Sequence, residues 1–168
     1  SNVGGNMKRI TFVIMLIMIL VMPLCSSASE TALLIFRKDD LYGYMKTNGD
    51  VVITPQYIRC YPFENGLSRA QNQEGYFGYI DTNGNVAIPF KYTHAYPFKE
   101  GFARVAIGTP WTNGGEKYFY INKNGQKIND HTYWWAEDFS GGLAKVMTQG
   151  HMEGPITQQR WSLIDTSG

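Results

Sequence analysis

The sequence has little net charge and almost no helical patterning. Its 168 residues include 15 basic and 14 acidic side chains, which leaves a formal net charge of +1. This balance provides no long-range field that would attract nucleic acid or an anionic membrane, so we expect neither as a partner. Beyond the N-terminal region, no segment of a dozen residues spaces apolar side chains three and four apart between capping residues. Long helices are therefore not expected.

Cysteine is also scarce, with only Cys25 and Cys60 in the chain. Cys25 belongs to an N-terminal segment that we expect to be removed, so one cysteine remains and no internal disulfide can form. We interpret Cys60 as a small buried residue. The folded domain must then be stabilised by the packing of its side chains rather than by covalent cross-links.

The N-terminal region has the three-part pattern of a secretory signal peptide. Met7 has the position of a natural start and is followed by the positive residues Lys8 and Arg9. A nearly unbroken apolar run, Ile10 to Leu24, comes next, and Ser26 to Ala28 supply the small residues at which a signal peptidase cleaves. The apolar run is short for a membrane-spanning helix of about 20 residues, so retention as an anchor is the less favoured alternative.

We therefore divide the chain into two parts. Residues 1–28 comprise the extra residues before the start methionine and the signal peptide, and residues 29–168 form a single β-repeat domain. This domain is expected to function outside the cytoplasm, as a secreted, periplasmic or cell-surface protein, with no membrane segment of its own.

What the sequence has in abundance is a repeated hairpin pattern. The stretch Phe77 to Tyr92, FGYIDTNGNVAIPFKY, is the second of three copies; the first is YGYMKTNGDVVITPQY at Tyr42 to Tyr57, and the third is YFYINKNGQKINDHTY at Tyr118 to Tyr133. A fourth copy begins at Trp161 as WSLIDTSG. Each complete copy places Asn-Gly between two β-prone runs, which is typical of a two-residue type I′ turn. We predict such turns, with positive φ at the glycine, at Gly49, Gly84 and Gly125.

The similarity continues beyond each hairpin. A recurring phenylalanine and a recurring glycine are followed by a third predicted strand. These positions are Phe63, Gly66 and Leu67–Ala70; Phe98, Gly101 and Phe102–Val105; and Phe139, Gly142 and Leu143–Val146. The hairpin glycines are spaced 35, 41 and 43 residues apart when Gly168 of the fourth copy is included. Self-similarity of this kind indicates an array of supersecondary units that cannot bury their apolar faces alone.

These positions resemble those of the bacterial WG repeat, whose pattern runs roughly Trp-Gly-Tyr-Ile-Asp, Gly, Val-Ile-Pro, Tyr, Phe, Gly-Leu-Ala. The resemblance extends from Ala32 to Gly168 and is strongest at Phe77–Asp81 and Gly101–Val105. The Trp-Gly dipeptide itself is altered in every copy, and the third copy has Ile128-Asn129 in place of Ile-Pro. The resemblance implies β-structured repeats in a surface or secreted bacterial protein, with no enzyme activity and no shared catalytic residues.

We predict an all-β fold: tandem antiparallel three-stranded β-meander repeats in an open, solenoid-like array of about three and a half repeats. A closed, propeller-like arrangement is the alternative. Residues Ala32–Ile35 are expected to act as a third strand ahead of the first hairpin. Pro55 and Pro89 are expected to end the second hairpin strands, since proline cannot donate to a ladder.

The fourth copy predicts an open sheet edge. Trp161–Asp165 should pair with the third strand around Ala144–Met147 and leave its other edge without an intramolecular partner. An open edge can pair with another chain, so edge-strand self-association is expected; continuation of the natural chain past Gly168 is the alternative.

The recurring side chains are assigned structural roles. The repeated tyrosines and phenylalanines are predicted to pack in the core or between repeats. Ile80 and Ile121 should face the opposite side of their strands from the neighbouring tyrosines. Arg69, Arg104 and Lys145 occupy equivalent positions, and we interpret them as solvated charges on an exposed strand face.

Candidate binding residues lie where the copies differ. All length differences fall in the connection from a third strand to the next hairpin, which has 7, 13 and 15 residues between equivalent positions. Insertions on one face of an array commonly mark a binding face. The longer connections carry Trp111 and His151. Trp134 and Trp135 form a second candidate, and at least one of them is expected to be exposed for stacking on a sugar ring or a protein. Loops without a ligand, and tryptophans packed beneath them, are the alternatives.

No set of residues indicates catalysis. The three histidines have no ligand spacing, and the sequence suggests neither a Ser/His/Asp set nor a glycine-rich phosphate loop, so no enzyme activity, metal or cofactor is expected. We predict a non-catalytic binding or interaction module with an unidentified protein or glycan partner. A cell-wall or host glycan-binding module is the first alternative, and a non-catalytic part of a larger secreted enzyme is the second.

Overall fold

The chain forms thirteen short β-strands in the residues that the computed structural model describes, 32–109, 115–149 and 159–167. All of these residues belong to one compact unit, residues 32–168. None of them is helical, which confirms the all-β prediction. The strands are β1 (Leu34–Lys38), β2 (Leu41–Met45), β3 (Val51–Tyr57), β4 (Arg59–Cys60), β5 (Leu67–Gln71), β6 (Phe77–Asp81), β7 (Val86–Tyr92), β8 (His94–Ala95), β9 (Phe102–Ile107), β10 (Lys117–Asn122), β11 (Trp135–Ala136), β12 (Leu143–Gln149) and β13 (Arg160–Asp165).

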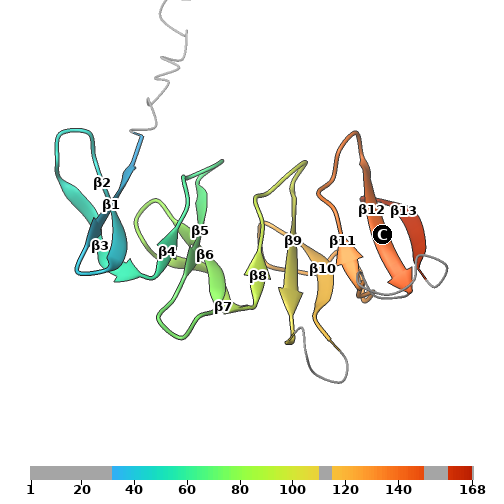
Figure 1. Cartoon of the computed structure of the whole chain (residues 1–168). Coiled ribbons are helices and arrows are strands. Elements are labelled where there is room, and N and C mark those ends of the chain that lie inside the picture. Colours follow the sequence, from blue (N-terminus) through green and yellow to red (C-terminus); the bar gives the residue numbers. More distant parts are fainter. Residues whose placement is uncertain (1–31, 110–114, 150–158, 168) are drawn as a thin grey trace, which may run out of the picture. The chain divides into compact units, whose positions relative to one another are not determined.

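Each sheet combines strands from two consecutive copies of the sequence repeat. The four sheets have the strand orders β1-β2-β3, β4-β5-β6-β7, β8-β9-β10 and β11-β12-β13 (Figure 1). The third strand of one copy pairs antiparallel with the first strand of the next, as β5 does with β6 and β9 does with β10. A copy therefore depends on its neighbour to complete a sheet, which is the behaviour expected of a repeat array.

The third strands β5, β9 and β12 lie where the sequence predicts them. The predicted strand at Ala32–Ile35 is wrong in register by one residue. Leu34 lies opposite Met45, so Leu33 takes the place that Leu67 has in the next repeat. Three additional strands, β4, β8 and β11, pair with the third strand of their own copy. At two residues each, they are too short to give a periodic signal in the sequence.

The hairpin glycines have positive φ, as predicted, but their turns are of a different type. The values are +93°, +87° and +76° at Gly49, Gly84 and Gly125, and the preceding asparagines do not have positive φ. In the second copy, Gly84 N–H donates to Asp81 O and Asp81 N–H donates to Asn85 O, both at 3.0 Å. This is a three-residue loop, in which a type I turn is followed by one left-handed glycine. Asp81 Oδ1 stabilises the loop by accepting the N–H groups of Asn83 and Asn85.

Turns with the type I′ geometry precede the third strands. They lie at Asn65-Gly66, Glu100-Gly101 and Gly141-Gly142, and both residues of each pair have positive φ. The flanking residues exchange two backbone hydrogen bonds, as Glu64 and Leu67 do. The recurring glycine before each third strand therefore lies in the left-handed region, which glycine adopts without steric cost.

Pro55 and Pro89 lie within strands β3 and β7 rather than at their ends, which corrects the prediction. The register of the pairing between β2 and β3 shifts at this point, which forms a β-bulge. Pro55 lies in the bulge, outside the paired positions of the ladder. The bulge also brings the β3 backbone against Gly43, where an added Cβ would lie 2.3 Å from Ile53 O. Gly43 leaves room for the bulge, and the bulge accommodates Pro55. The glycine and the proline therefore occur together.

The third copy departs from this pattern. Phe119 replaces the glycine, and no proline occurs between Gly125 and Tyr133. Residues 127–133 form no continuous strand and are joined to β10 by two isolated bridges. The Phe119 side chain is 4% exposed and packs on Tyr92 of the second copy, with ring centroids 6.1 Å apart.

One tyrosine in each first strand organises the core, as predicted for the recurring aromatics. Its hydroxyl donates to the backbone carbonyl seventeen residues later, at 2.9, 2.7 and 2.6 Å in the three copies. Its ring contacts the recurring phenylalanine, with centroids 4.7 to 5.0 Å apart. Burial raises the pKa of all three phenols, and the hydrogen bond compensates the buried hydroxyl. The pairs are Tyr44–Phe63, Tyr79–Phe98 and Tyr120–Phe139.

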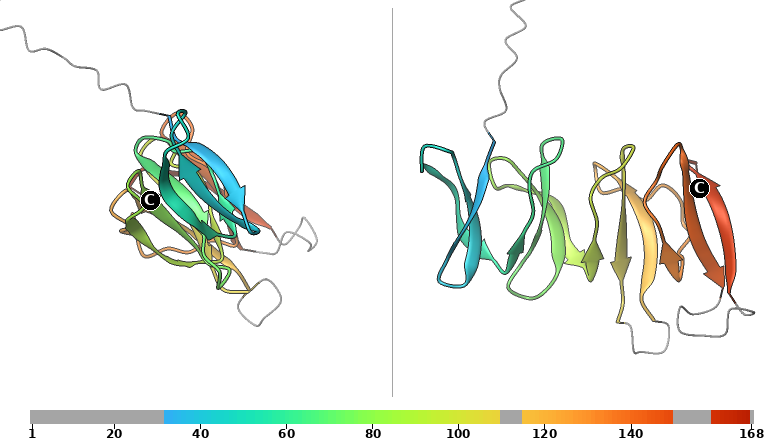
Figure 2. Two further views of the ribbon diagram at one scale, coloured as in Figure 1. Left: turned by 90° about the vertical axis from the view of Figure 1, so that its left-hand side faces the viewer. Right: turned by 45° about the horizontal axis from the view of Figure 1, so that its top comes forward.

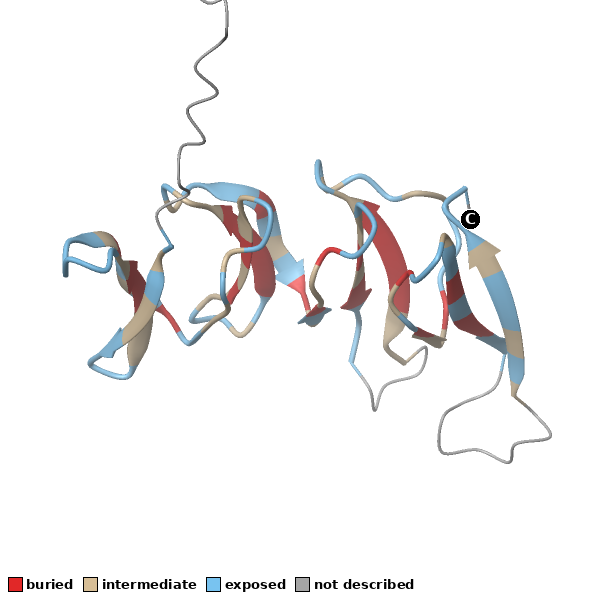
Figure 3. Ribbon diagram, turned by 90° about the horizontal axis from the view of Figure 1, so that it is seen from above, coloured by how far each residue is buried: buried red, intermediate tan, exposed pale blue. Residues whose placement is uncertain are grey.

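The residue after each of these tyrosines faces the other side of the strand and packs in the preceding copy. Ile80 joins the cluster around Tyr44, and Ile121 joins the cluster around Tyr79. Strands β6 and β10 are consequently buried on both faces, and Figure 3 shows buried residues concentrated in the middle of the sheets. This confirms the predicted facing of the isoleucines and links consecutive copies through apolar contacts.

The described strands form an open array. β13 pairs with β12, as predicted for Trp161–Asp165, and no other described strand pairs with it. Leu163 in β13 is 67% exposed. At the other end of the array, β1 pairs with β2 alone among the described strands, so the ring of the propeller-like alternative is not closed (Figure 2).

Candidate functional site

The strand ends that flank the connections from third strands to the following first strands lie at one end of the sheets, and the type I′ turns lie at the other (Figure 2). The strand bounds leave 2 residues between β1 and β2, 5 between β5 and β6, 9 between β9 and β10, and 10 between β12 and β13. We call these the first to fourth connections. The predicted site residues Trp111 and His151 lie outside the described residues.

Trp134 lies close to Gly115, near the C-terminal end of the third connection, residues 108–116. Its backbone N–H donates to Met147 O at 2.9 Å, and a Cβ added to Gly115 would lie 2.9 Å from its ring. The Lys117 ammonium group lies over the face of the same ring. Burial lowers the pKa of Lys117, and the indole quadrupole favours a cation in this position.

Trp135 packs into the core. It lies in β11 opposite Met147, and its ring centroid is 5.2 Å from that of Tyr118. Both tryptophans are partly buried, so the prediction that at least one is exposed is wrong. The physical reason is that Gly115 of the third connection lies against the Trp134 ring. Trp135 packs against the apolar cluster of the third copy.

Glu116 connects the third connection to the segment that follows β7. Its Oε1 accepts hydrogen bonds from Thr93 Oγ1 at 2.6 Å and His94 Nδ1 at 2.5 Å, and its Oε2 accepts one from Tyr118 Oη at 3.0 Å. The Glu116 side chain is 11% exposed and that of His94 is 48% exposed. Burial, with the Glu116 charge as a smaller cause, raises the pKa of Tyr118. The carboxylate is thus held in one position by charge-assisted bonds.

Glu116 could not be found from the sequence because its partners lie in different segments of the chain and share no spacing. Lys117 and Trp134 form what we call the Trp134 site, and the neighbouring Glu116 belongs to a second cluster with Thr93 and His94. The Trp134 site offers an indole ring and a cation, and the second cluster offers a fixed carboxylate and a half-exposed imidazole. The indole can contact a ring of a ligand, and the ammonium group can donate hydrogen bonds to its polar groups.

Arg69 links two consecutive copies, so its interpretation as a solvated charge is wrong. Its guanidinium lies 3.7 Å above the ring centroid of Tyr61, and its Nη1 donates to Ala95 O of the next copy at 3.0 Å. The equivalent Lys145 lies over Trp161 of the fourth copy. These cationic side chains extend to the next copy because a backbone carbonyl or an aromatic ring there interacts with them in place of water.

Arg104 makes the same link with one more partner. Its guanidinium lies 3.6 Å above the ring centroid of Tyr96, and it donates to Ala136 O and, at 2.7 Å, to Asp138 Oδ1. The Arg104 side chain is 14% exposed. The prediction of a solvated charge is therefore also wrong for Arg104.

Within the described part of the chain, no group of three or more His, Cys, Asp or Glu side chains could hold a metal ion, and no helix is long and apolar enough to span a membrane. Cys60 is a free thiol and is only partly buried; burial raises its pKa to about 11.

The fold defines an all-β repeat protein in which the copies share their packing residues and differ in their connections. The family model of the WG containing repeat matches residues 42–76, 77–108 and 118–150. These matches cover more than half of the chain, and the chain belongs to this family. No curated protein matches the chain.

Proposed function

We propose that this chain is a non-catalytic protein-binding module that functions outside the cytoplasm, secreted or at the cell surface, and that binds through the long connections. One observation carries the proposal: the positions that the copies share are used in packing between strands and copies, whereas the connections lengthen from 2 to 10 residues at one end of the sheets. Variable loops on a rigid scaffold are where repeat proteins place their binding residues.

The Trp134 site supports the use of this end. A partly buried tryptophan with a cation on its face resembles the aromatic and charged groups that dominate protein interfaces. The N-terminal pattern of Lys8 and Arg9, an apolar run and small residues supports export.

Shortening the third connection tests the binding proposal. Residues 108–116 are replaced by the five residues of the second connection, 72–76, whose hairpin joins equivalent strands. A partner captured from the envelope or medium of the source cells is purified, and its affinity for both forms is measured by calorimetry. We expect the shortened variant to melt within a few degrees of the parent and to bind at least roughly tenfold more weakly.

The matched control shortens a different connection. Residues 72–76 are replaced by Asp39-Asp40, the two-residue turn of the first connection, which leaves the Trp134 site intact. This variant should keep full affinity. Equal binding by the parent and by the variant shortened at 108–116 would contradict the proposal.

Export is tested separately. The chain is expressed in secretion-competent cells, and the mass of the exported product is measured. A product beginning near Ser29 is expected, whereas an uncleaved chain retained in the cytoplasm would contradict the proposed location.

A glycan ligand is the second candidate, and Trp134 favours it because a partly exposed indole beside an ammonium group suits a sugar ring and its hydroxyls. A glycan array should then give signals that Trp134→Ala abolishes and Trp134→Phe partly retains. Signals that are unchanged in Trp134→Ala would remove this candidate.

A further inference from the structure

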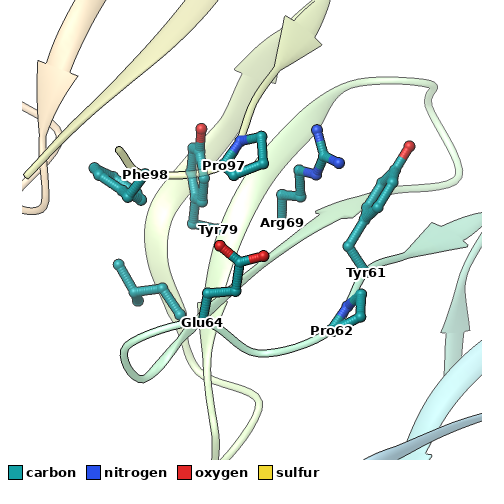
Figure 4. Close-up of a pocket in the computed structure, with 8 residues that line it drawn as sticks. Tyr61, Pro62, Glu64, Arg69, Tyr79, Pro97 and Phe98 are labelled. Carbon is teal, nitrogen blue, oxygen red and sulfur yellow. The ribbon is translucent and has the colours of Figure 1, made fainter. Parts of the chain in front are cut away.

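A small pocket lies where the third strand of the first copy meets the second copy; we call this contact the first junction. The pocket encloses about 50 Å³. A bound water needs ~10–15 Å³ by a comparable measure, so the space suits a group of a few heavy atoms. Figure 4 shows the lining residues, which are Tyr61, Pro62, Glu64, Leu67, Arg69, Tyr79, Pro97 and Phe98.

At the second junction, where β9 meets the third copy, side chains occupy the positions equivalent to this pocket. Asp138 stands there in the position of Pro97, and its Oδ1 accepts a hydrogen bond from Arg104 Nε at 2.7 Å. Phe102 stands in the position of Leu67, and its ring centroid lies 5.4 Å from that of Phe139. The second junction thus supplies a carboxylate to its arginine and an aromatic ring to its phenylalanine.

The first junction supplies neither group. Arg69 has the same stacking on a tyrosine and the same bond to a backbone carbonyl as Arg104. No carboxylate among the described residues lies within ion-pairing distance of Arg69; the nearest acidic lining residue, Glu64, is half exposed and lies 3.9 Å from Lys99 Nζ. A guanidinium has five donors, and stacking fixes the plane in which they point.

We propose that this Arg69 pocket binds the C-terminal carboxylate of a peptide whose last side chain is apolar. The carboxylate takes the place that Asp138 has in the second junction, and the apolar side chain takes the place of the Phe102 ring, against Leu67 and Phe98. Arginine forms bidentate bonds to carboxylates, which fixes the ligand's orientation.

A chain end suits the pocket better than an acidic side chain. The carboxylate and the apolar group must arrive together in a space of about 50 Å³, and a terminal residue presents both from a single Cα. The pocket lies near the type I′ turn between Glu64 and Leu67, at the opposite end of the third strand from the connections. It is therefore independent of the protein-binding surface proposed above.

Titration of the ¹⁵N-labelled protein with short peptides tests the proposal. The probes are acetyl-Gly-Gly-Leu with a free carboxylate, its C-terminal amide, and the capped peptide acetyl-Gly-Asp-Gly-amide. The free acid should shift the Arg69 Nε–H and Leu67 N–H signals and bind at least roughly tenfold more tightly than the amide. Equal binding of the amide would overturn the proposal, and equal binding of the capped aspartate peptide would overturn the assignment to a chain end.

Pro97→Asp is the decisive variant because it copies the second junction into the first. It should place a carboxylate on Arg69, keep or raise the melting temperature, and abolish binding of the free-acid peptide. Arg69→Gln should also abolish binding, but it removes the bond to Ala95 O and can weaken the fold. Binding that persists in a folded Pro97→Asp protein would overturn the proposal.

Two further variants complete the test. Glu64→Gln removes a negative charge from the rim and should tighten binding of the free acid several-fold; weaker binding would contradict the placement of the carboxylate beside Arg69. Asp138→Asn changes the second junction alone and should leave the peptide shifts at Leu67 unchanged.

Discussion

The second and third hairpins begin with related residues but are built differently. In the second copy, Gly78 allows the seven-residue strand β7 to bulge against β6, and Pro89 lies in that bulge. In the third copy, Phe119 stands at the glycine position, and residues 127–133 keep only isolated bridges to β10. A side chain at this position is incompatible with the close approach of the bulged strand, so the glycine determines whether the second hairpin strand can form.

Phe119 shows how the third copy compensates for the lost strand. Its side chain is buried in the cluster that contains Tyr79, Tyr92 and Ile88 of the second copy. Burial of a phenylalanine contributes free energy that a hairpin ladder would otherwise provide. A copy can therefore exchange its own regular pairing for packing on its neighbour.

Removing the Phe119 side chain should have the largest effect. Phe119→Ala leaves a cavity in the cluster of the second copy and should lower the free energy of unfolding by about 4 kcal/mol, measured by urea denaturation. Phe119→Leu, the control, keeps most of the volume and should cost about 1 kcal/mol. A loss below about 1 kcal/mol for the alanine variant would show that the aromatic does not replace the missing strand.

Adding a methyl group at the glycine of the second hairpin should have the next largest effect. A Cβ at Gly78 would lie 2.8 Å from Ile88 O and 3.0 Å from the Phe90 ring. Gly78→Ala should therefore cost about 2–3 kcal/mol in urea denaturation through overpacking.

The control for this variant is Gly66→Ala, where φ is +81° and nothing lies within 4 Å of an added Cβ. It reports backbone strain alone and should cost about 1 kcal/mol. Equal losses at the two glycines would mean that the close approach of β7 has no energetic consequence.

The buried tyrosine hydroxyl should matter equally in both copies. Tyr79 donates to Tyr96 O at 2.7 Å and Tyr120 donates to Glu137 O at 2.6 Å, although only the second copy has a regular hairpin. Tyr79→Phe and Tyr120→Phe should each lower the free energy of unfolding by about 1 kcal/mol. A difference larger than about 1 kcal/mol between them would show that the irregular hairpin changes the role of the tyrosine.

The smallest effect should be a pH dependence confined to the second turn. The side-chain hydrogen bond from Asn85, together with backbone N–H donors, lowers the pKa of Asp81 from its ordinary 3.8. Because the folded-state pKa is below the unfolded value, the turn contributes stability above pH 3.8 and loses it as the pH falls through the folded-state pKa.

The third copy has Asn122 at the position of Asp81, with the same backbone bonds. Asp81→Asn should therefore flatten the acid limb of the stability profile below about pH 5, measured by urea midpoints. An acid limb of unchanged slope in Asp81→Asn would assign the pH dependence to other carboxylates.

Much of the fold could be predicted because it depends on local patterns that recur. The third strands, the positive φ of the turn glycines and the burial of the tyrosines all follow from residue types at fixed spacing. The hairpin turn type could not be predicted in the same way, since Asn-Gly fits both loops. In the second and third copies the three-residue loop is stabilised by the side chains of Asp81 and Asn122, which accept backbone N–H groups of the loop.

The candidate site was less predictable because its contacts join different copies. Arg104 reaches an acceptor 32 residues away, and Glu116 is fixed by His94 from a separate strand. Trp134 looked like an exposed aromatic because the sequence does not show that Gly115 approaches its ring. Contacts of this kind depend on how consecutive copies are placed in space, which no single copy encodes.

The stagger between sequence copies and sheets has a consequence for how such a chain can change in length. Because every internal sheet takes a third strand from one copy and a first strand from the next, the boundary between units is arbitrary. A duplication or deletion of one whole period can therefore begin at any point in the period and still leave every sheet with its full set of strands. Recombination within the repeats would tolerate many breakpoints. Only an insertion or deletion that is not a whole number of periods would disrupt the fold.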